Sequence, residues 1–183
     1  MTRALLIALL MPLASNFSSC AATEKEPEPI SLIRSGSLAV AMHGVARVAL
    51  HPRGRLVRIE EGKDADSLRM SVDSAVTEHF RDYGYVIVGP DRADVLVAYA
   101  VGVTGQLDDA ALERAFGVAA GMDLGDGVQR GALVMTIVNR RTGLSRWRAS
   151  ASAPAENLPV AERDSAIQGA VAELLRGLPK IPR

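Results

Sequence analysis

The chain contains three histidines, and histidine is the side chain that most often serves as a general base in an enzyme. A serine hydrolase places such a base beside a nucleophile and a third group that orients it. His79 falls on the apolar side of an amphipathic stretch, next to Phe80, which is typical of a buried structural histidine. His43 and His51 have no acidic neighbour that the sequence fixes, and no Gly-x-Ser-x-Gly motif occurs. We therefore predict no catalytic residue.

Two pairs of aspartates are candidates for metal binding. Asp123 and Asp126 stand in a glycine-rich stretch, but their spacing breaks the alternate-residue ligand pattern of an EF-hand loop. Asp108 and Asp109 precede a short amphipathic segment, where capping a helix is the simpler role. A chain with one cysteine lacks the ligand spacing of a zinc site, and no phosphate-binding loop occurs. The sequence predicts no metal ion and no cofactor.

The stretch "LSRWRASA" contains a candidate binding surface. Side chains alternate between the two faces of a strand, so Arg146 and Arg148 are expected on one face of a sheet. Ser145, Trp147 and Ala149 are then expected on the other face. If the helices of the domain cover Trp147, the two arginines project from the open face.

Arg140 and Arg141 lie in the turn just before this strand and extend the candidate surface. Three further arginines join it if their own strand is adjacent: Arg53, Arg55 and Arg58. Guanidinium groups pair with carboxylates and phosphates, so the surface suits an anionic glycan, a lipid headgroup or an acidic protein. A solvated face, balanced by acids such as Glu60 and Glu61, is the competing interpretation.

Cys20 is the only cysteine, and it follows an apolar run closely. Arg3, the run "ALLIALLMPL" and the small polar residues after it have the three-part pattern of an export signal. A run of about ten residues is too short to span a bilayer, which needs about twenty. A lone cysteine cannot form an internal disulfide, and a free thiol invites intermolecular pairing in an oxidising compartment.

The position of Cys20 after Ser18 and Ser19 resembles the modified residue of a bacterial lipoprotein. The resemblance implies that the Cys20 thiol carries a diacylglyceryl group, that residues 1–19 are removed and that the new amino group is acylated. Two or more acyl chains give stable anchoring, at about 0.8 kcal/mol for each buried methylene. Ala21, which is not Asp, implies transport to the outer membrane. Ordinary cleavage just after Cys20 is the alternative, and it gives a soluble periplasmic protein.

The rest of the chain divides into a tether and one domain. Residues 20–36 include the polar, proline-spaced stretch "AATEKEPEPI", which favours a flexible tether. Residues 37–183 form a single domain, because 48% hydrophobic and 23% charged residues are a globular balance.

Two helices and several strands are expected in the domain. Apolar residues recur at helical spacing over 66–83 and 160–176, with Asp64 or Asp66 as the first N-cap and Gly84 at its C-terminal end. A short helix over 107–117 precedes a glycine-rich loop. Strands are expected in these stretches: "SLAVAM", "VARVAL" as far as Pro52, "GRLVRIEEG", "YVIV", "ADVLVAYAVGV", "ALVMTIV" and "LSRWRASA". This order predicts an α+β fold, a mostly antiparallel sheet of about four to six strands with two main amphipathic helices packed on one face.

The order of elements and several stretches resemble a family of bacterial envelope lipoproteins, domain of unknown function 4136. The matching stretches are "VDSAVTEHFRDYGYVIVGPDRADVLVAYAVG", "RGALVMTIVNRRTGLSRWRASA" and "AVAELLRGLPKIP". They lie within 66–182, which is most of the domain. The resemblance implies the fold and an envelope location, and it assigns no catalytic residue.

Composition also narrows the class of partner that the chain can bind. The formal net charge is zero and aromatic residues make up 4% of the chain, so a nucleic-acid partner is not expected. We expect a non-enzymatic binding or interaction module, held on the periplasmic side of the outer membrane by its lipid anchor. Its possible partners are an envelope protein or an anionic glycan or lipid. The alternatives are an envelope-associated hydrolase or transferase with a non-local active site, and a soluble periplasmic ligand-binding protein.

Overall fold

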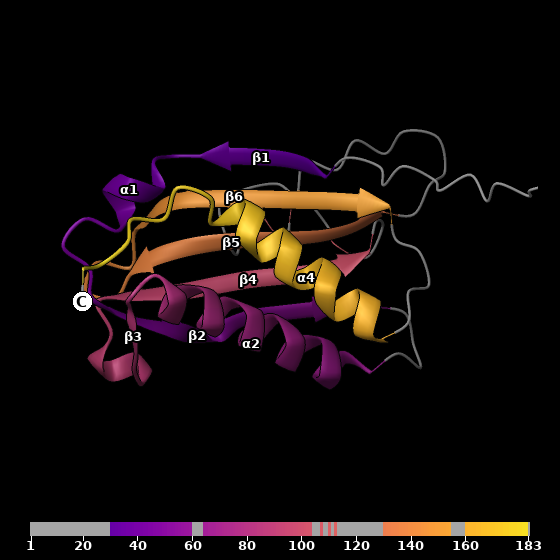
Figure 1. Cartoon of the computed structure of the whole chain (residues 1–183), viewed down its shortest axis with the longest axis horizontal. Helices are drawn as coiled ribbons and strands as arrows, with labels where there is room; N and C mark the ends of the chain where they lie inside the picture. The colour runs from indigo at the N-terminus through magenta and orange to yellow at the C-terminus, as the bar shows by residue number, and fades with distance from the viewer. Residues whose placement is uncertain are drawn as a thin grey trace, which may run out of the picture.

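A six-stranded mixed sheet forms one layer of the domain, and two long helices cover one of its faces (Figure 1). The computed structural model describes residues 30–59, 64–103, 107, 110, 112, 130–154 and 160–182. In chain order its elements are β1 (Ser31–Ser35), α1 (Leu38–Ala41), β2 (Arg47–Arg58), α2 (Ala65–Asp82), β3 (Val86–Ile87), the 3₁₀ turn η1 (Pro90–Arg92), β4 (Val95–Val103), β5 (Arg130–Asn139), β6 (Ser145–Pro154) and α4 (Val160–Leu174).

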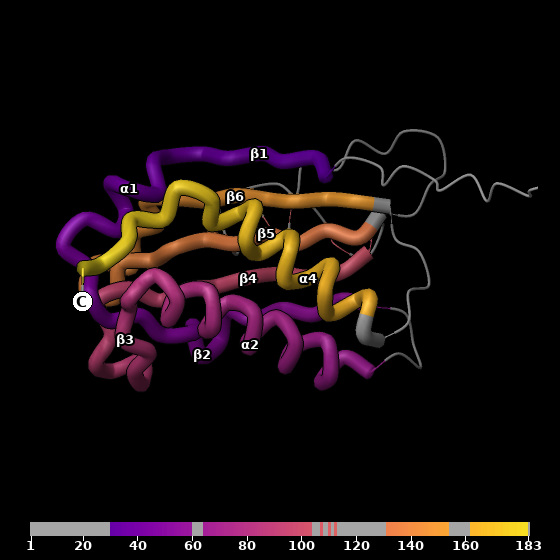
Figure 2. The backbone as a smooth tube through the Cα atoms, in the orientation of Figure 1, coloured from indigo at the N-terminus to yellow at the C-terminus, as the bar shows by residue number. Residues whose placement is uncertain are grey.

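The strands lie in the order β1-β6-β5-β4-β2-β3. Neighbouring strands from β1 to β4 are antiparallel, whereas β2 is parallel to both β4 and β3. The parallel part arises because α2 carries the chain from the end of β2 back to the end where β2 began. α2 and α4 lie side by side over the same face (Figure 2). The predicted α+β class with two main helices is confirmed, with a sheet that is mixed rather than purely antiparallel.

The main core fills the space between the helices and the sheet. β4 lies inside the sheet as predicted, and its Val97 and Tyr99 side chains are fully buried beneath the helices. Trp147 from β6 belongs to the same core, so the condition set in the sequence analysis for the arginine surface is met. The helices contribute buried side chains at three- and four-residue spacing: Leu68, Val72, Ala75, Val76 and Phe80 from α2, and Ile167, Val171 and Leu174 from α4.

The second face of the sheet carries a smaller apolar cluster. Ala98 and Ala100 of β4 and Val134 of β5 contact Leu107 and Leu112, which follow β4 in the chain. This part of the second face is therefore covered rather than open. Apart from these two leucines and Ala110, the predicted short helix and glycine-rich loop lie outside the described residues.

Both ends of α2 have the residues that the sequence predicts. Asp64 is the N-cap, and its Oδ1 accepts a hydrogen bond from the Ser67 amide at 2.9 Å. Gly84, just after the C-cap, adopts a left-handed conformation with φ at +90°. A Cβ atom there would lie 2.7 Å from the Ile181 carbonyl oxygen, so glycine also allows the C-terminal segment to pack closely.

The N-terminal part differs from the prediction in two places. "SLAVAM" was expected as a strand, but Leu38–Ala41 forms the short helix α1, because Ser37 caps it and Leu and Ala favour helices. β1 lies at Ser31–Ser35, within the segment that the sequence assigned to the tether, and pairs with β6.

β2 forms one continuous strand through Pro52, where the sequence predicted an end. The outer neighbour β3 pairs only with Arg47 and Val48, so no described strand flanks Pro52 on that side. A proline lacks the amide hydrogen that a flanking strand would need, and an edge tolerates it. A register shift between Leu50 and Arg55 accommodates the Pro52–Gly54 stretch.

Candidate interaction surface

The four arginines predicted as a binding surface separate into two places. Arg140 and Arg141 lie in the β5–β6 turn, and Arg146 lies at the start of β6. All three are exposed at one end of the sheet. Arg148 is half-buried and lies further along β6, where it pairs with Thr136 on the second face.

A β-bulge separates Arg146 from Arg148. Ile137 pairs with Trp147 but Val138 pairs with Ser145, so Arg146 is the extra residue of the bulge. The prediction that Ser145 shares a face with Trp147 is therefore wrong, because a bulge breaks the alternation of side chains.

Hydrogen bonds on the second face hold the bulge in place. The Ser145 hydroxyl lies 2.6 Å from the Thr136 hydroxyl. Arg148 Nε donates to Ser145 Oγ at 3.2 Å. Arg148 therefore supports the bulge instead of joining the other three arginines.

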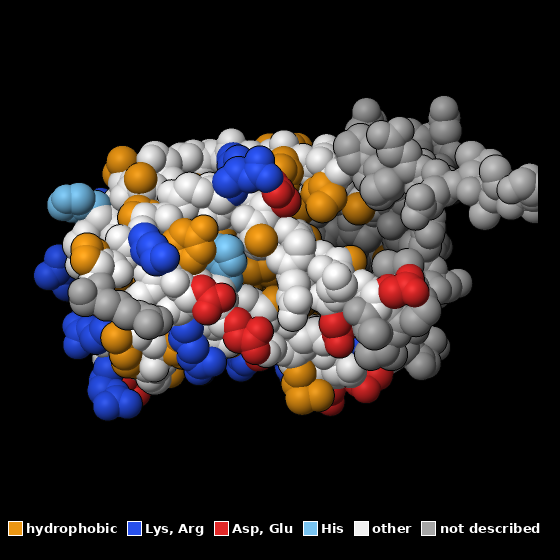
Figure 3. Space-filling view, viewed as in Figure 1, with side chains coloured by type: hydrophobic (Ala, Val, Ile, Leu, Met, Phe, Trp, Pro, Cys, Tyr) orange, Lys and Arg blue, Asp and Glu red, His pale blue; other side chains and the backbone are white. Residues whose placement is uncertain are grey.

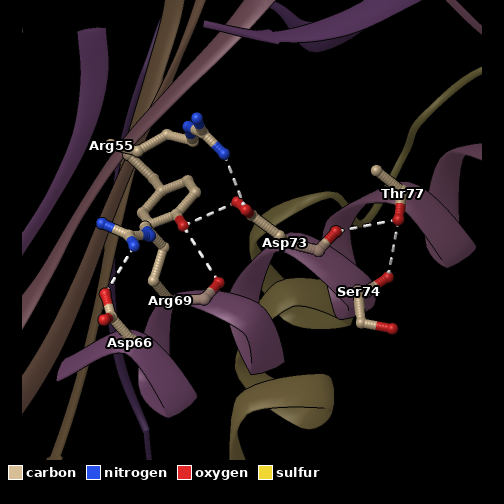
Figure 4. A network of polar contacts seen from close by, with 7 residues as sticks. Arg55, Asp66, Arg69, Asp73, Ser74 and Thr77 are labelled. Carbon is tan, nitrogen blue, oxygen red and sulfur yellow. Dashed lines mark hydrogen bonds and ion pairs between the residues drawn. The ribbon is translucent and has the colours of Figure 1, made fainter. Parts of the chain in front are cut away.

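The β2 arginines do not extend the surface either, because β5 and β4 lie between β6 and β2. Arg55 points to the helix layer, where its Nη1 donates to Asp73 Oδ2 at 2.8 Å (Figure 4). Asp73 Oδ1 accepts a hydrogen bond from the Tyr99 hydroxyl at 2.7 Å. Burial, followed by the hydrogen bond to Asp73, raises the pKa of Tyr99 well above its usual value. This network fastens α2 to the sheet.

Arg47, which the sequence reasoning missed, joins Arg140 at the start of β4. Arg47 Nη2 donates to Asp94 Oδ1 at 2.6 Å, and the Arg47 amide donates to Asp94 Oδ2 at 2.9 Å. The Arg140 amide donates to the Asp94 carbonyl at 3.2 Å, and Arg140 Nε donates to the Ala93 carbonyl at 2.7 Å. Two guanidinium groups are thus held by neighbouring residues, that of Arg47 by the Asp94 carboxylate and that of Arg140 by the Ala93 carbonyl.

The Asp94 carboxylate stays ionised over a wide pH range. The side-chain hydrogen bond from Arg47 is the main cause, and it lowers the pKa of Asp94 to about 2. A signal for this contact was present in the sequence, since Asp94 directly precedes the most apolar strand and Arg47 begins another strand. Their proximity could not be read from the sequence because it depends on the parallel pairing of β2 with β4.

We define the basic end of the domain as residues 36–47, 83–94, 139–146 and 178–182. These segments meet where β1 and β5 end and β2, β4 and β6 begin. The C-terminal segment is held there by a hydrogen bond from the Ile181 amide to the Tyr83 carbonyl at 2.8 Å. The basic end contains six basic residues, Arg47, Arg92, Arg140, Arg141, Arg146 and Lys180, but only two acidic ones, Asp91 and Asp94.

The charges are unevenly distributed over the whole helix-covered side of the molecule. In Figure 3, Lys and Arg side chains gather toward the end that carries α1 and β3, whereas Asp and Glu side chains lie from the middle toward the opposite end. A shallow depression of about 490 Å³ lies at the margin of the basic end, lined by Gly84, Lys180, Ile181 and Pro182 and by Asp82, an acidic residue just outside it.

Of the three histidines, His79 and His51 lie outside the basic end and His43 lies within it. His79 is half-buried and stacks on Tyr83 with a ring separation of 4.8 Å. Burial lowers the pKa of His79, and the nearby Asp82 opposes that effect. His51 Nδ1 accepts a hydrogen bond from the Arg53 amide at 3.2 Å, and burial lowers its pKa as well. His43 is exposed within the basic end.

Metal ligands and membrane spans can be assessed only where the chain is described. Within those residues, no three His, Cys, Asp or Glu side chains lie together as a metal ion would require. No described helix combines the length and the apolar character needed to cross a membrane. The remaining candidates lie outside the described residues: Cys20, Asp108, Asp109, Asp123 and Asp126.

Comparison by sequence gives no relative, since no protein-family model and no curated protein matches the chain. The resemblance to domain of unknown function 4136 therefore stays a prediction.

Comparison by structure does give similar proteins. Two structures of the PelC dodecamer from Paraburkholderia phytofirmans cover 84% of this chain and 100% of theirs, with TM-scores of 0.51 and 0.50 and identities of 13% and 14%. A PDZ domain protein from Parabacteroides distasonis aligns with a TM-score of 0.52 and 11% identity, over 85% of this chain and 36% of that one. A lipoprotein from Neisseria meningitidis has a TM-score of 0.37 and 14% identity, over 70% of this chain and 96% of its own. At these identities the PelC and PDZ domain protein comparisons show a shared fold alone.

Proposed function

We propose that this protein is a lipid-anchored module on the periplasmic side of the outer membrane, and that it binds a partner rather than catalysing a reaction. The basic end is the observation that carries the proposal. The full chain has no net formal charge, yet folding gathers six basic residues against two acidic ones at one end of the sheet. A concentrated field of this sign attracts an anionic partner and orients it during encounter.

The position of β1 supports the anchor. Ten residues, Ala21 to Ile30, separate Cys20 from the first strand. A chain of that length spans at most about 35 Å, so an acylated Cys20 would keep the domain close to the bilayer. We expect mass spectrometry of the mature N-terminus to find a diacylglyceryl group and an acyl chain on Cys20. A Cys20→Ala variant should then leave membrane vesicles on washing without detergent.

The fold also supports assembly of several copies. The PelC chain, which is similar over its whole length, forms a dodecamer. We propose that copies of this chain associate too, because identical subunits commonly form closed symmetric assemblies. Native mass spectrometry of the detergent-solubilised protein tests this part, and a monomer at micromolar concentration contradicts it.

The binding role is tested by removing charge from the basic end. Arg141→Gln combined with Arg146→Gln should reduce retention of the protein's domain on purified envelope fractions, and the remaining retention should depend less on salt. Arg53→Gln with Arg58→Gln is the matched control, because both arginines are exposed and lie outside the basic end. Equal retention of the two variants and the unaltered protein would contradict the proposal.

A further inference from the structure

The chain enters the described part of the domain at the end of the sheet opposite to the basic end. Ser31, where the chain enters β1, pairs with Ser152 near the end of β6. The basic end includes Ser145 at the start of β6, and the seven residue-to-residue steps from Ser145 to Ser152 span about 23 Å at the rise of a β-strand. In Figure 1, β1 accordingly runs from the entry of the chain toward α1 at the basic end. The basic end thus faces away from the point of attachment.

Exposed apolar side chains are interspersed with these charges. Val40 on α1, Val86 on β3 and Leu144 before β6 are 61%, 56% and 63% exposed. Val86 lies on β3 and Leu144 lies next to β6. Four inter-strand spacings separate these two strands, a distance of about 19 Å across the sheet. The exposed apolar side chains are thus spread across this end of the sheet among the charged ones.

The basic residues themselves favour a protein partner. Five of the six are arginines, which are enriched in protein interfaces where lysine is depleted. Arg47 and Arg140 are already held in place at Asp94 and Ala93, so little side-chain entropy is lost when their remaining N–H groups bind carboxylates. The large hydrophobic residues exposed in the described part of the chain include no Phe, Tyr or Trp, the rings that most often serve as stacking platforms for sugars.

We infer that the basic end docks on an acidic protein surface in the periplasm, away from the anchoring bilayer, with Val40, Val86 and Leu144 buried in the contact. The inference rests on the proposed function and specifies its partner. Carboxylates of the partner pair with the arginines around the contact, while aliphatic burial supplies the part of the affinity that is insensitive to salt.

The first experiment uses defined anionic probes and the full-length lipidated protein in neutral phosphatidylcholine vesicles. The probes are poly-L-glutamate, separate phosphatidylglycerol vesicles and the carboxylated glycan polygalacturonate. Binding to poly-L-glutamate should weaken by about tenfold or more in the Arg141→Gln/Arg146→Gln variant and stay unchanged in the Arg53→Gln/Arg58→Gln control. Stronger binding to phosphatidylglycerol vesicles or to polygalacturonate overturns the inference in favour of a lipid or glycan partner.

The second experiment places a photo-cross-linking residue at Val86 or Leu144 of the full chain in intact cells. Met70 on α2 is the matched control, because it is 64% exposed but lies outside the basic end. The inference expects one protein joined from Val86 and Leu144 and not from Met70, with the cross-link next to Asp or Glu residues of that protein. In a binding assay with the purified partner protein, a Val86→Ser/Leu144→Ser variant should bind about tenfold more weakly than the unaltered protein, even at high salt.

The outcomes separate the inference from the proposed function. Binding to an anionic probe without a specific protein cross-link removes the protein partner and leaves the binding module standing. Failure of all three probes together with the absence of any cross-link removes both. Cross-linking from Met70 as strong as that from Val86 also overturns the inference, since contact would not be confined to the basic end.

Discussion

The Tyr99 hydroxyl donates a hydrogen bond to Asp73 Oδ1 at 2.7 Å and so joins the central strand β4 to helix α2. Arg55 Nη1 donates to the other carboxylate oxygen at 2.8 Å, which holds Asp73 from two strands at once. Tyr99 is fully buried, so water cannot replace Asp73 as the partner of its hydroxyl group. The contact thereby fixes which side of α2 faces the sheet.

Removing the Asp73 carboxylate should destabilise the domain more than removing the Tyr99 hydroxyl. Tyr99→Phe should cost about 1 kcal/mol, because one hydrogen bond is lost while Asp73 keeps Arg55. Asp73→Ala should cost about 2 kcal/mol, because the Arg55 guanidinium loses its partner and the buried Tyr99 hydroxyl keeps only the Arg69 carbonyl, at 3.2 Å. Urea unfolding of the two single variants and the double variant measures the coupling. Strictly additive effects would contradict a direct interaction between these side chains.

Two glycines allow a matched test of packing. A Cβ atom on Gly102 in β4 would lie within contact distance of Leu107 and collide with the Arg58 carbonyl oxygen of β2. Gly102→Ala should therefore destabilise the domain by about 2 kcal/mol. Gly169 lies within α4 and has no atom within 4 Å of the added methyl, so Gly169→Ala should stabilise by about 1 kcal/mol. Thermal unfolding of both variants gives the comparison, and shifts of the same sign would contradict the close approach of β2 and β4.

Periodicity predicted the central elements of the fold. The apolar faces of α2 and α4, the two apolar faces of β4 and the β5–β6 hairpin could all be read from local patterns. β1 could not, because "SLIRS" is short and mostly exposed and gains its strand conformation from pairing with β6. The parallel pairing of β2 and β4 was also missed, although a strand, a helix and a strand in succession form a crossover.

The candidate surface was predicted in part. Arg140, Arg141 and Arg146 do lie at one end of the sheet, whereas the bulge places Arg148 beside Ser145. Local alternation cannot reveal a bulge, because a single extra residue reverses the face of every later side chain. Arg47 and Lys180 come to the basic end from distant parts of the chain. Only the strand order and the packing of the C-terminal segment bring them there.

The stability of the domain should fall on mild acidification because of His79. Its Nε2 is buried and has no hydrogen-bond partner within the described residues, and burial lowers the pKa of the ring in the folded state. The unfolded chain therefore binds a proton more readily than the folded one, so stability is retained above pH about 6.5 and decreases as pH falls below it. The free energy of unfolding, measured with urea at pH about 7.5 and about 5.5, should decrease less in His79→Gln than in the unaltered protein. His43→Gln, at an exposed position, is the control and should keep the original pH dependence. An unchanged decrease in His79→Gln would assign the acid sensitivity to other groups, with His51 the next to test, since burial lowers its pKa too.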